Sequence, residues 1–243
     1  MKTKTKALLI TMCAALLVVA TVFTTLAFLT DTKNVVNTFT VGDVQITLDE
    51  ADVDEYGKIL YEADSSTPLT RVPTNDYKLI PNHKYTKDPV IHTSADSEDS
   101  YVRMFVTLSQ ASAWDTALAR YTTGEGGNKK PINTTEDIFT DTNADWEIVK
   151  TIEGDAEGGA GEGYRTYEFR YENKVAKSTN VPAPFESITV PKELQNDDLK
   201  NIDGTAHDFK IFVVAQAIQA DGFENATAAF TAAPAITGSD LTP

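Results

Sequence analysis

The chain has 243 residues with 36 acidic and 21 basic side chains, which gives a formal net charge of −15 at pH 7. Binding of nucleic acid needs a basic surface, so this charge excludes nucleic acid as a partner. The single cysteine, Cys13, lies in an apolar run near the N-terminus. Thiol catalysis and cysteine-based zinc sites are therefore excluded for the rest of the chain.

The first 27 residues are predicted to form a secretory signal peptide. Three lysines among the first six residues precede a run, residues 7–29, that has no charged side chain. Thr25 and Ala27 are small residues that suit the −3 and −1 positions of a cleavage site. The alternative is a retained membrane anchor, since about 20 apolar residues span a bilayer. In both cases the lysines stay on the cytoplasmic side of the membrane and the rest of the chain is exported across it. This predicts a secreted or cell-surface protein.

Cleavage after Ala27 removes three basic and no acidic side chains. The mature chain of 216 residues then has 18 basic and 36 acidic side chains, a net charge of −18. Met12 stands where a lipoprotein signal would need a small residue before Cys13. The charge favours solubility and makes self-association sensitive to salt or divalent cations. Without disulfides, a chain of this length is expected to rely on one sizeable core.

Alternation of apolar and polar residues with a period of two predicts an all-β sandwich. In "YVRMFVTLS", Val102, Met104, Val106 and Leu108 share one face. The segment "DFKIFVVAQAIQA" is apolar on both faces, which is typical of a central strand covered on each side. Further strands are predicted at residues 39–48, 88–93, 145–152, 164–172 and 185–190.

Few helices are expected, and their positions in the sequence indicate insertions between strands. The candidates are residues 109–121, 191–201 and 224–230. Glycine-rich loops are expected at 123–131 and 154–163, the second as the tip of a hairpin. We expect an N-terminal arm at 28–40, a single domain at 41–230, and a flexible C-terminal tail at 231–243, because the tail lacks periodicity.

No motif in the sequence brings catalytic or cofactor-binding groups together. His83, His92 and His207 do not belong to HExxH, and no two of them have the helical spacing that places two ligands on one face. Neither G-x-S-x-G nor G-x-x-x-x-G-K-[ST] occurs. "DTNADW" opens like a calcium loop, but Trp146 replaces its glycine. The acidic run 48–55 is expected to be a solvated strand end. We therefore predict no catalytic, cofactor-binding or metal-binding residue.

Four segments together resemble the TasA/camelysin group of proteins secreted by Gram-positive bacteria, whose signal peptides are cut by a SipW-type signal peptidase. They are "AFLTDTKNVVNTFTVGDVQITLDE", "LIPNHKYTKDPVIHTSADSEDSYVRMFVTLS", "DWEIVKTI…YRTYEFRYENKV" and "FKIFVVAQAIQADGFENA". They span most of the mature chain. The resemblance implies a jelly-roll β-sandwich with helices and loops inserted at its edges.

For the fibre-forming members, the resemblance implies an extracellular fibre or biofilm matrix built by donor-strand complementation. The N-terminal segment of one subunit would complete the sheet of the next, because an added strand satisfies the unpaired N–H and C=O groups of a sheet edge. On this sequence the donor would be residues 28–39, with five apolar anchors: Phe28, Leu29, Val35, Val36 and Phe39. The implied partners are other copies or a related fibre subunit, and the SipW-type peptidase. The membrane would be contacted only transiently, through the signal segment.

Three alternatives stay open at this point. The camelysin branch implies a surface zinc metalloendopeptidase, which would use some of His83, His92 and His207 with acidic ligands. Long polar loops would also suit a monomeric adhesin. The N-terminal arm could be disordered or paired within its own subunit instead of serving a neighbour.

Overall fold

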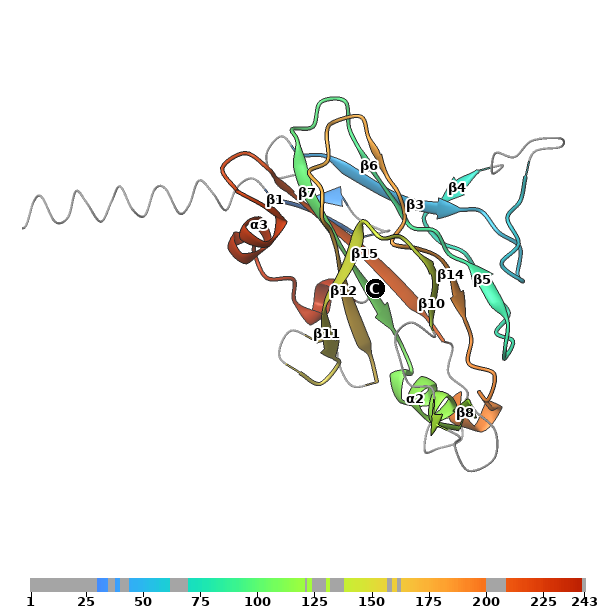
Figure 1. The fold of residues 1–243 in the computed structure, drawn as a ribbon. Helices are drawn as coiled ribbons and strands as arrows, with labels where there is room; N and C mark the ends of the chain where they lie inside the picture. Colours follow the sequence, from blue (N-terminus) through green and yellow to red (C-terminus); the bar gives the residue numbers. More distant parts are fainter. Residues whose placement is uncertain are drawn as a thin grey trace, which may run out of the picture.

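The computed structural model describes ten segments of the chain: residues 30–34, 38–39, 44–61, 70–120, 122–123, 130–131, 138–156, 159–160, 163–199 and 209–241. These segments are predominantly β, with antiparallel sheets and two α-helices (Figure 1). The predicted all-β class is confirmed. None of the helices in these segments is long and apolar enough to cross a membrane.

The larger layer is a six-stranded antiparallel sheet in the order β11-β12-β7-β15-β1-β2. Its strands are β1 (Thr30–Asn34), β2 (Thr38–Phe39), β7 (Ser100–Leu108), β11 (Trp146–Glu153), β12 (Arg165–Tyr171) and β15 (Ile211–Gln219). All nine residues of β7 are buried. Strand β15 lies between β7 and β1, so the predicted central strand is confirmed.

The second layer consists of two smaller sheets, ordered β13-β6-β3-β4 and β10-β14-β5. Their strands are β3 (Ile46–Ala51), β4 (Arg71–Val72), β5 (Lys84–Thr86), β6 (Val90–Thr93), β10 (Phe139–Thr142), β13 (Asn180–Val181) and β14 (Phe185–Thr189). Strands β8 (Thr122–Thr123) and β9 (Lys130–Pro131) form a separate ribbon.

Prolines divide the second layer into these two sheets. Strand β5 leads into β6 and β13 leads into β14, and β5–β14 and β6–β13 are both antiparallel pairs. The breaks fall at Pro89 and at Pro182 and Pro184, where a backbone N–H is missing and the ladder cannot continue. The backbone N–H of Lys87 still donates to the carbonyl of Glu186 (3.0 Å), which extends the β5–β14 pair up to the break. The two sheets are therefore one layer with a shared interruption.

The core between the layers has an aromatic centre. The ring of Phe139, on β10, lies 5.2 Å from Tyr167, 5.3 Å from Phe169 and 4.7 Å from Phe185 between centroids. Helix α2 (Ala111–Arg120) adds Trp114, which is only 1% exposed. The four apolar residues predicted to share the inner face of β7 all belong to this core.

The outer face of the large sheet is covered as well. Helix α3 (Ala226–Ala232) places Phe230 against Tyr101 and Ile218. The chain beyond it, including the short helix η4 (Gly238–Asp240), brings Leu241 against Phe105 and Val214. This covering gives β7 and β15 packed side chains on both faces.

Two of the three predicted helices are present as α-helices. The segment predicted at 109–121 is α2, and the one at 224–230 is α3 shifted by two residues. Within 191–201, the described residues form only the 3-10 turn η3 (Asn196–Leu199).

The tail was expected to be flexible, but Leu241 is fully buried. The tail is an irregular segment that a few apolar contacts hold in place, so its sequence needs no periodic pattern.

Burial of Leu241 predicts a measurable contribution of the tail to stability. Leu241→Ala should lower the free energy of unfolding by about 2–5 kcal/mol, because it leaves a cavity beside Phe105 and Val214. Urea denaturation of the mature chain measures this loss. Leu60→Ala is the matched control, since Leu60 is 38% exposed. Equal midpoints for the two variants would show that the tail is not docked.

One edge of the large sheet is irregular. Among the described strands, β11 is paired only with β12, and their register shifts between Ile148 and Lys150. Glu147, Lys150 and Glu153 are exposed along this strand. Charged side chains and a register shift are features that discourage further strand pairing.

Candidate functional site

The N-terminal arm forms strand β1, which pairs antiparallel with β15 of the same chain (Figure 1). The register runs from Thr30 opposite Ile218 to Asn34 opposite Val214. On its other side, among the described residues, β1 pairs only with the two residues of β2. In the single chain, the arm is thus paired within its own subunit, as one of the three alternatives left open by the sequence.

The structure describes only part of the predicted donor segment. Of the five predicted anchors, Phe39 lies in β2, with its backbone opposite Thr32. The others, Phe28, Leu29, Val35 and Val36, lie outside the described residues, as do the whole signal segment and its cleavage residues Thr25 and Ala27. The prediction that the arm forms a strand agrees with the backbone at residues 30–34 and 38–39.

Strand β15 offers two different faces to the arm. On the inner face, Ala215 and Ala217 are fully buried in the core between the layers. On the outer face, Val214 and Ile218 contact the C-terminal covering at the two ends of the paired stretch. Between them stands Gln216, which is 1% exposed. The seam between β1 and β15 therefore has an apolar frame with a polar residue at its middle.

Gln216 belongs to a buried polar cluster that spans three strands. The Nε–H of Arg103 donates to Gln216 Oε1 (2.7 Å), and Nη1 donates to Glu168 Oε1 (3.0 Å). Arg170 donates to the same carboxylate oxygen (2.9 Å). Because the site is desolvated, the pKa of Arg103 is lowered, although the charge of Glu168 opposes that shift.

Aromatic rings enclose this cluster. The Arg103 guanidinium lies 4.8 Å from the ring centroid of Phe105 and 4.5 Å from that of Phe230, within the range of cation–π attraction. The charged centre is thus held between β7 and helix α3. The sequence alone does not reveal this cluster, because its members come from three strands that are dozens of residues apart. The signal that could have indicated it is a charged residue inside each of two predicted strands that are otherwise apolar or aromatic.

The described histidines have separate environments. His83 Nε2 lies 2.8 Å from the carbonyl oxygen of Tyr56, and its ring meets Tyr85 edge-on at 4.6 Å. His92 lies between Asp49 Oδ1 and Asn180 Oδ1, each 2.8 Å from a ring nitrogen. His207 is outside the described residues. Within the segments that the structure covers, no three His, Cys, Asp or Glu side chains are grouped so that they could hold a metal ion.

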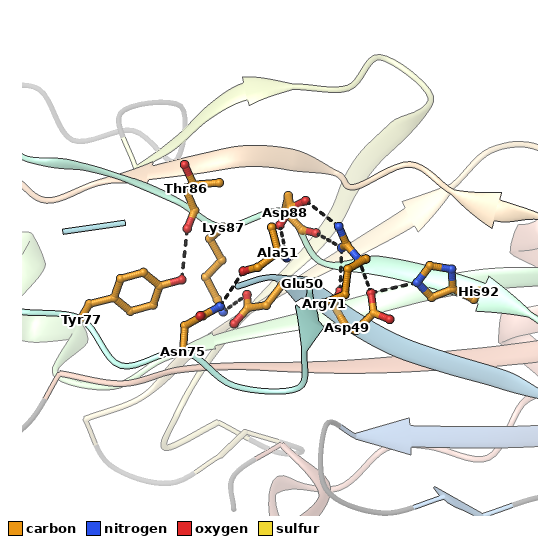
Figure 2. Close-up of polar contacts among 10 residues, drawn as sticks. All are labelled: Asp49, Glu50, Ala51, Arg71, Asn75, Tyr77, Thr86, Lys87, Asp88 and His92. Carbon is orange, nitrogen blue, oxygen red and sulfur yellow. Dashed lines mark hydrogen bonds and ion pairs between the residues drawn. The ribbon is translucent and has the colours of Figure 1, made fainter. Parts of the chain in front are cut away.

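A second polar cluster lies at the end of β3, beside the break between β5 and β6 (Figure 2). Arg71 bridges Asp49 Oδ1 (2.5 Å) and Asp88 Oδ2 (3.1 Å), and it also donates to both backbone carbonyls. Deeper in, Lys87 Nζ contacts Glu50 Oε2 at 2.5 Å. Glu50 is only 5% exposed, so the expectation of a fully solvated acidic strand end at 48–55 is wrong for this residue. Its burial is possible because Lys87 supplies the opposite charge.

Comparison with known proteins adds no relative: no family model, no curated protein and no solved structure matches this chain. The resemblance of four segments to a secreted family therefore stays a prediction. The feature of the chain that bears most directly on function is the seam between the N-terminal arm and the last strand.

Proposed function

We propose that the protein is a secreted structural subunit of an extracellular or cell-surface fibre, and that its copies are joined by exchange of strand β1. One observation carries the proposal: the first strand pairs with the last one over five consecutive residues, from Thr30 opposite Ile218 to Asn34 opposite Val214. A β1 from a second copy can make the same pairs with β15, so the closed monomer and the exchanged polymer use one interface.

The jelly-roll form of the sandwich is part of this proposal. The order β12-β7-β15-β1 supports it, because the first strand lies beside the last, as the two-sheet wrapping of a jelly roll requires. The opposite layer runs from β10 through the antiparallel pairs β14–β5 and β13–β6, which are separated by the proline breaks, to β3. In such a wrapping, β1 is a terminal element that can leave without unthreading the rest.

The balance between the two forms depends on concentration and on the state of the N-terminus. Exchange replaces each β1–β15 pair with an identical one, so the closed form is favoured chiefly by the high effective concentration of its own arm. While the signal is attached, the arm is held at the membrane; cleavage near Ala27 frees it. A head-to-tail contact that does not close on itself then extends as a filament. The mature charge of −18 opposes this contact, so salt should promote it.

Disulfide trapping between two chains tests the exchange directly, because the mature chain has no cysteine. One sample carries Lys33→Cys and a second carries Ala215→Cys, two positions that face each other across β1 and β15. Mixed and oxidised after cleavage of the signal, the two chains should form a covalent heterodimer that denaturing electrophoresis detects. Cross-strand partners have Cβ atoms about 4.5–5.5 Å apart, close enough for a disulfide after small adjustment.

The matched control uses two cysteine positions on the same two strands that do not face each other in this register. Asn34→Cys mixed with Ile218→Cys places the thiols at opposite ends of the seam, since Asn34 faces Val214. It should give no heterodimer above the level of random collision. Electron microscopy of the mature chain with and without residues 28–39 supplies the second readout. Equal filament formation by both chains, or equal trapping by both cysteine pairs, would exclude the exchange.

A further inference from the structure

The buried pair of Lys87 and Glu50 has a chemical environment that differs from an ordinary ion pair. Their side chains are only 9% and 6% exposed. Glu50 Oε2 is the single hydrogen-bond partner that Lys87 Nζ has among the described residues, although an ammonium group has three donors. Burying a charge that is only partly satisfied is costly. Proton transfer from Lys87 to Glu50 would remove both charges and leave a neutral amine, which is a nucleophile.

An activated amide lies at the same place. The side chain of Asn75 is clamped to the backbone on both sides of its carbon: its Nδ2 donates to the carbonyl of Ala51 (2.9 Å), and its Oδ1 accepts from the N–H of Val53 (3.1 Å). An N–H that donates to a carbonyl oxygen polarises the carbonyl and stabilises negative charge that develops there. Figure 2 shows the ends of the Lys87, Glu50 and Asn75 side chains converging at the end of β3.

The half-buried Tyr77 lies beside this trio. Burial raises the pKa of the Tyr77 phenol, and the charge of Glu50 adds to the shift, while a hydrogen bond with Asn75 opposes it. The same phenol donates to the carbonyl of Thr86 (3.1 Å). Tyr77 therefore lies against both Glu50 and Asn75 and stays protonated. Lys87 and Glu50 are buried, whereas Asn75 and Tyr77 are half-buried. The low exposure of the Lys87–Glu50 pair strengthens its electrostatic contacts, which favours attack of the amine on the amide.

We propose that Lys87 and Asn75 form an intramolecular amide bond, with Glu50 as the group that moves the proton. Glu50 takes a proton from Lys87 Nζ, and the nitrogen attacks Cγ of Asn75. The N–H of Val53 stabilises the charge on Oδ1. Glu50 then passes this proton to Nδ2, the Cγ–Nδ2 bond breaks, and ammonia leaves. As the neutral amide forms, Nζ gives up its second proton to Glu50, which hands it to the departing ammonia, so that ammonium is released and the Glu50 carboxylate is restored. No oxidant or cofactor is needed. The bond would fix the loop after β4 to the break between β5 and β6, in a mature chain that has no disulfide.

Mass spectrometry of the purified mature protein, denatured before measurement, tests the bond. The intact wild-type chain should be lighter than its sequence by one ammonia. Trypsin should fail to cleave after Lys87 and should release a branched peptide that joins residues 72–78 to residues 85–103. A wild-type chain with full sequence mass overturns the proposal. Loss of one water, mapped to Lys87 and Glu50, also overturns it, because the carbonyl would then come from the wrong residue.

Three variants make the result specific. Lys87→Met should restore the full mass. Lys84→Met should keep the mass loss, because Lys84 is an exposed lysine on β5 that forms an ion pair with Asp141. Asn75→Asp should lose water instead of ammonia and reach the same final mass as the wild type, and this comparison does not depend on whether Lys87→Met folds. Persistence of the mass loss in Lys87→Met would overturn the assignment. The outcome is independent of fibre formation, since no atom of β1 or β15 takes part.

Discussion

Phe139→Ala should lower the free energy of unfolding by about 3–5 kcal/mol, because it removes the ring at the centre of the core. Phe139 is 2% exposed and packs against Tyr167, Phe169 and Phe185, which come from the two opposed layers. Its loss would leave a cavity that both layers line, and neither layer can collapse into it alone. Urea denaturation followed by tryptophan fluorescence measures the change.

The control for this variant is Ile148→Ala on the edge strand β11. Ile148 is 38% exposed, so its truncation should change the free energy of unfolding by no more than about 0.5 kcal/mol. If Phe139→Ala were as mild as Ile148→Ala, the two layers would not share the aromatic centre described above, and the packing of the sandwich would have to be reconsidered.

Glu168→Leu should cost about 3–5 kcal/mol, because it leaves the charge of Arg103 buried without its partner. Glu168 accepts from both Arg103 and Arg170, and its side chain is 7% exposed. The loss should appear as a lower denaturation midpoint with an unchanged slope. The double variant Arg103→Met with Glu168→Leu should recover part of the stability, since it removes the stranded charge.

Asp99→Ala provides the comparison for this second result. It breaks the pair of Asp99 with Lys174 (2.8 Å), whose side chains are 46% and 55% exposed. An exposed pair of this kind contributes little to stability, because water and salt screen the attraction between its charges. A cost for Glu168→Leu no larger than that of Asp99→Ala, or a double variant less stable than the single one, would contradict the role given to the buried cluster.

Sequence periodicity was sufficient where a strand is long and its environment is regular. In β7, the inward set of Val102, Met104, Val106 and Leu108 follows from alternation alone, because a period of two places these residues on one face. The two-sided apolar character of residues 209–219 likewise identified β15 as an inner strand. These features depend on local sequence, so they can be seen without knowledge of the partners.

Features that depend on distant partners could not be predicted in this way. Glu50 lies in an acidic run and looks solvated, and only Lys87, 37 residues away, explains its burial. The tail appears irregular from its sequence alone, because its anchor Leu241 packs against Phe105 and Val214, which come from much earlier in the chain. For the arm, the sequence indicated a strand, and the structure pairs that strand within its own chain. Under the proposed exchange, the choice between pairing within one subunit and pairing between two would depend on concentration and processing, which residue types do not encode.

The irregular edge at β11 has a consequence for the shape of any assembly that grows through β1. A sheet whose two borders were equally receptive would add neighbours on both sides and spread into a ribbon or an amorphous mat. Here the border formed by β11 carries exposed Glu147, Lys150 and Glu153 and a register shift, and such borders resist unplanned pairing. Under the proposed strand exchange, addition would therefore be limited to the opposite border, and a filament would grow in one direction with a width of one subunit.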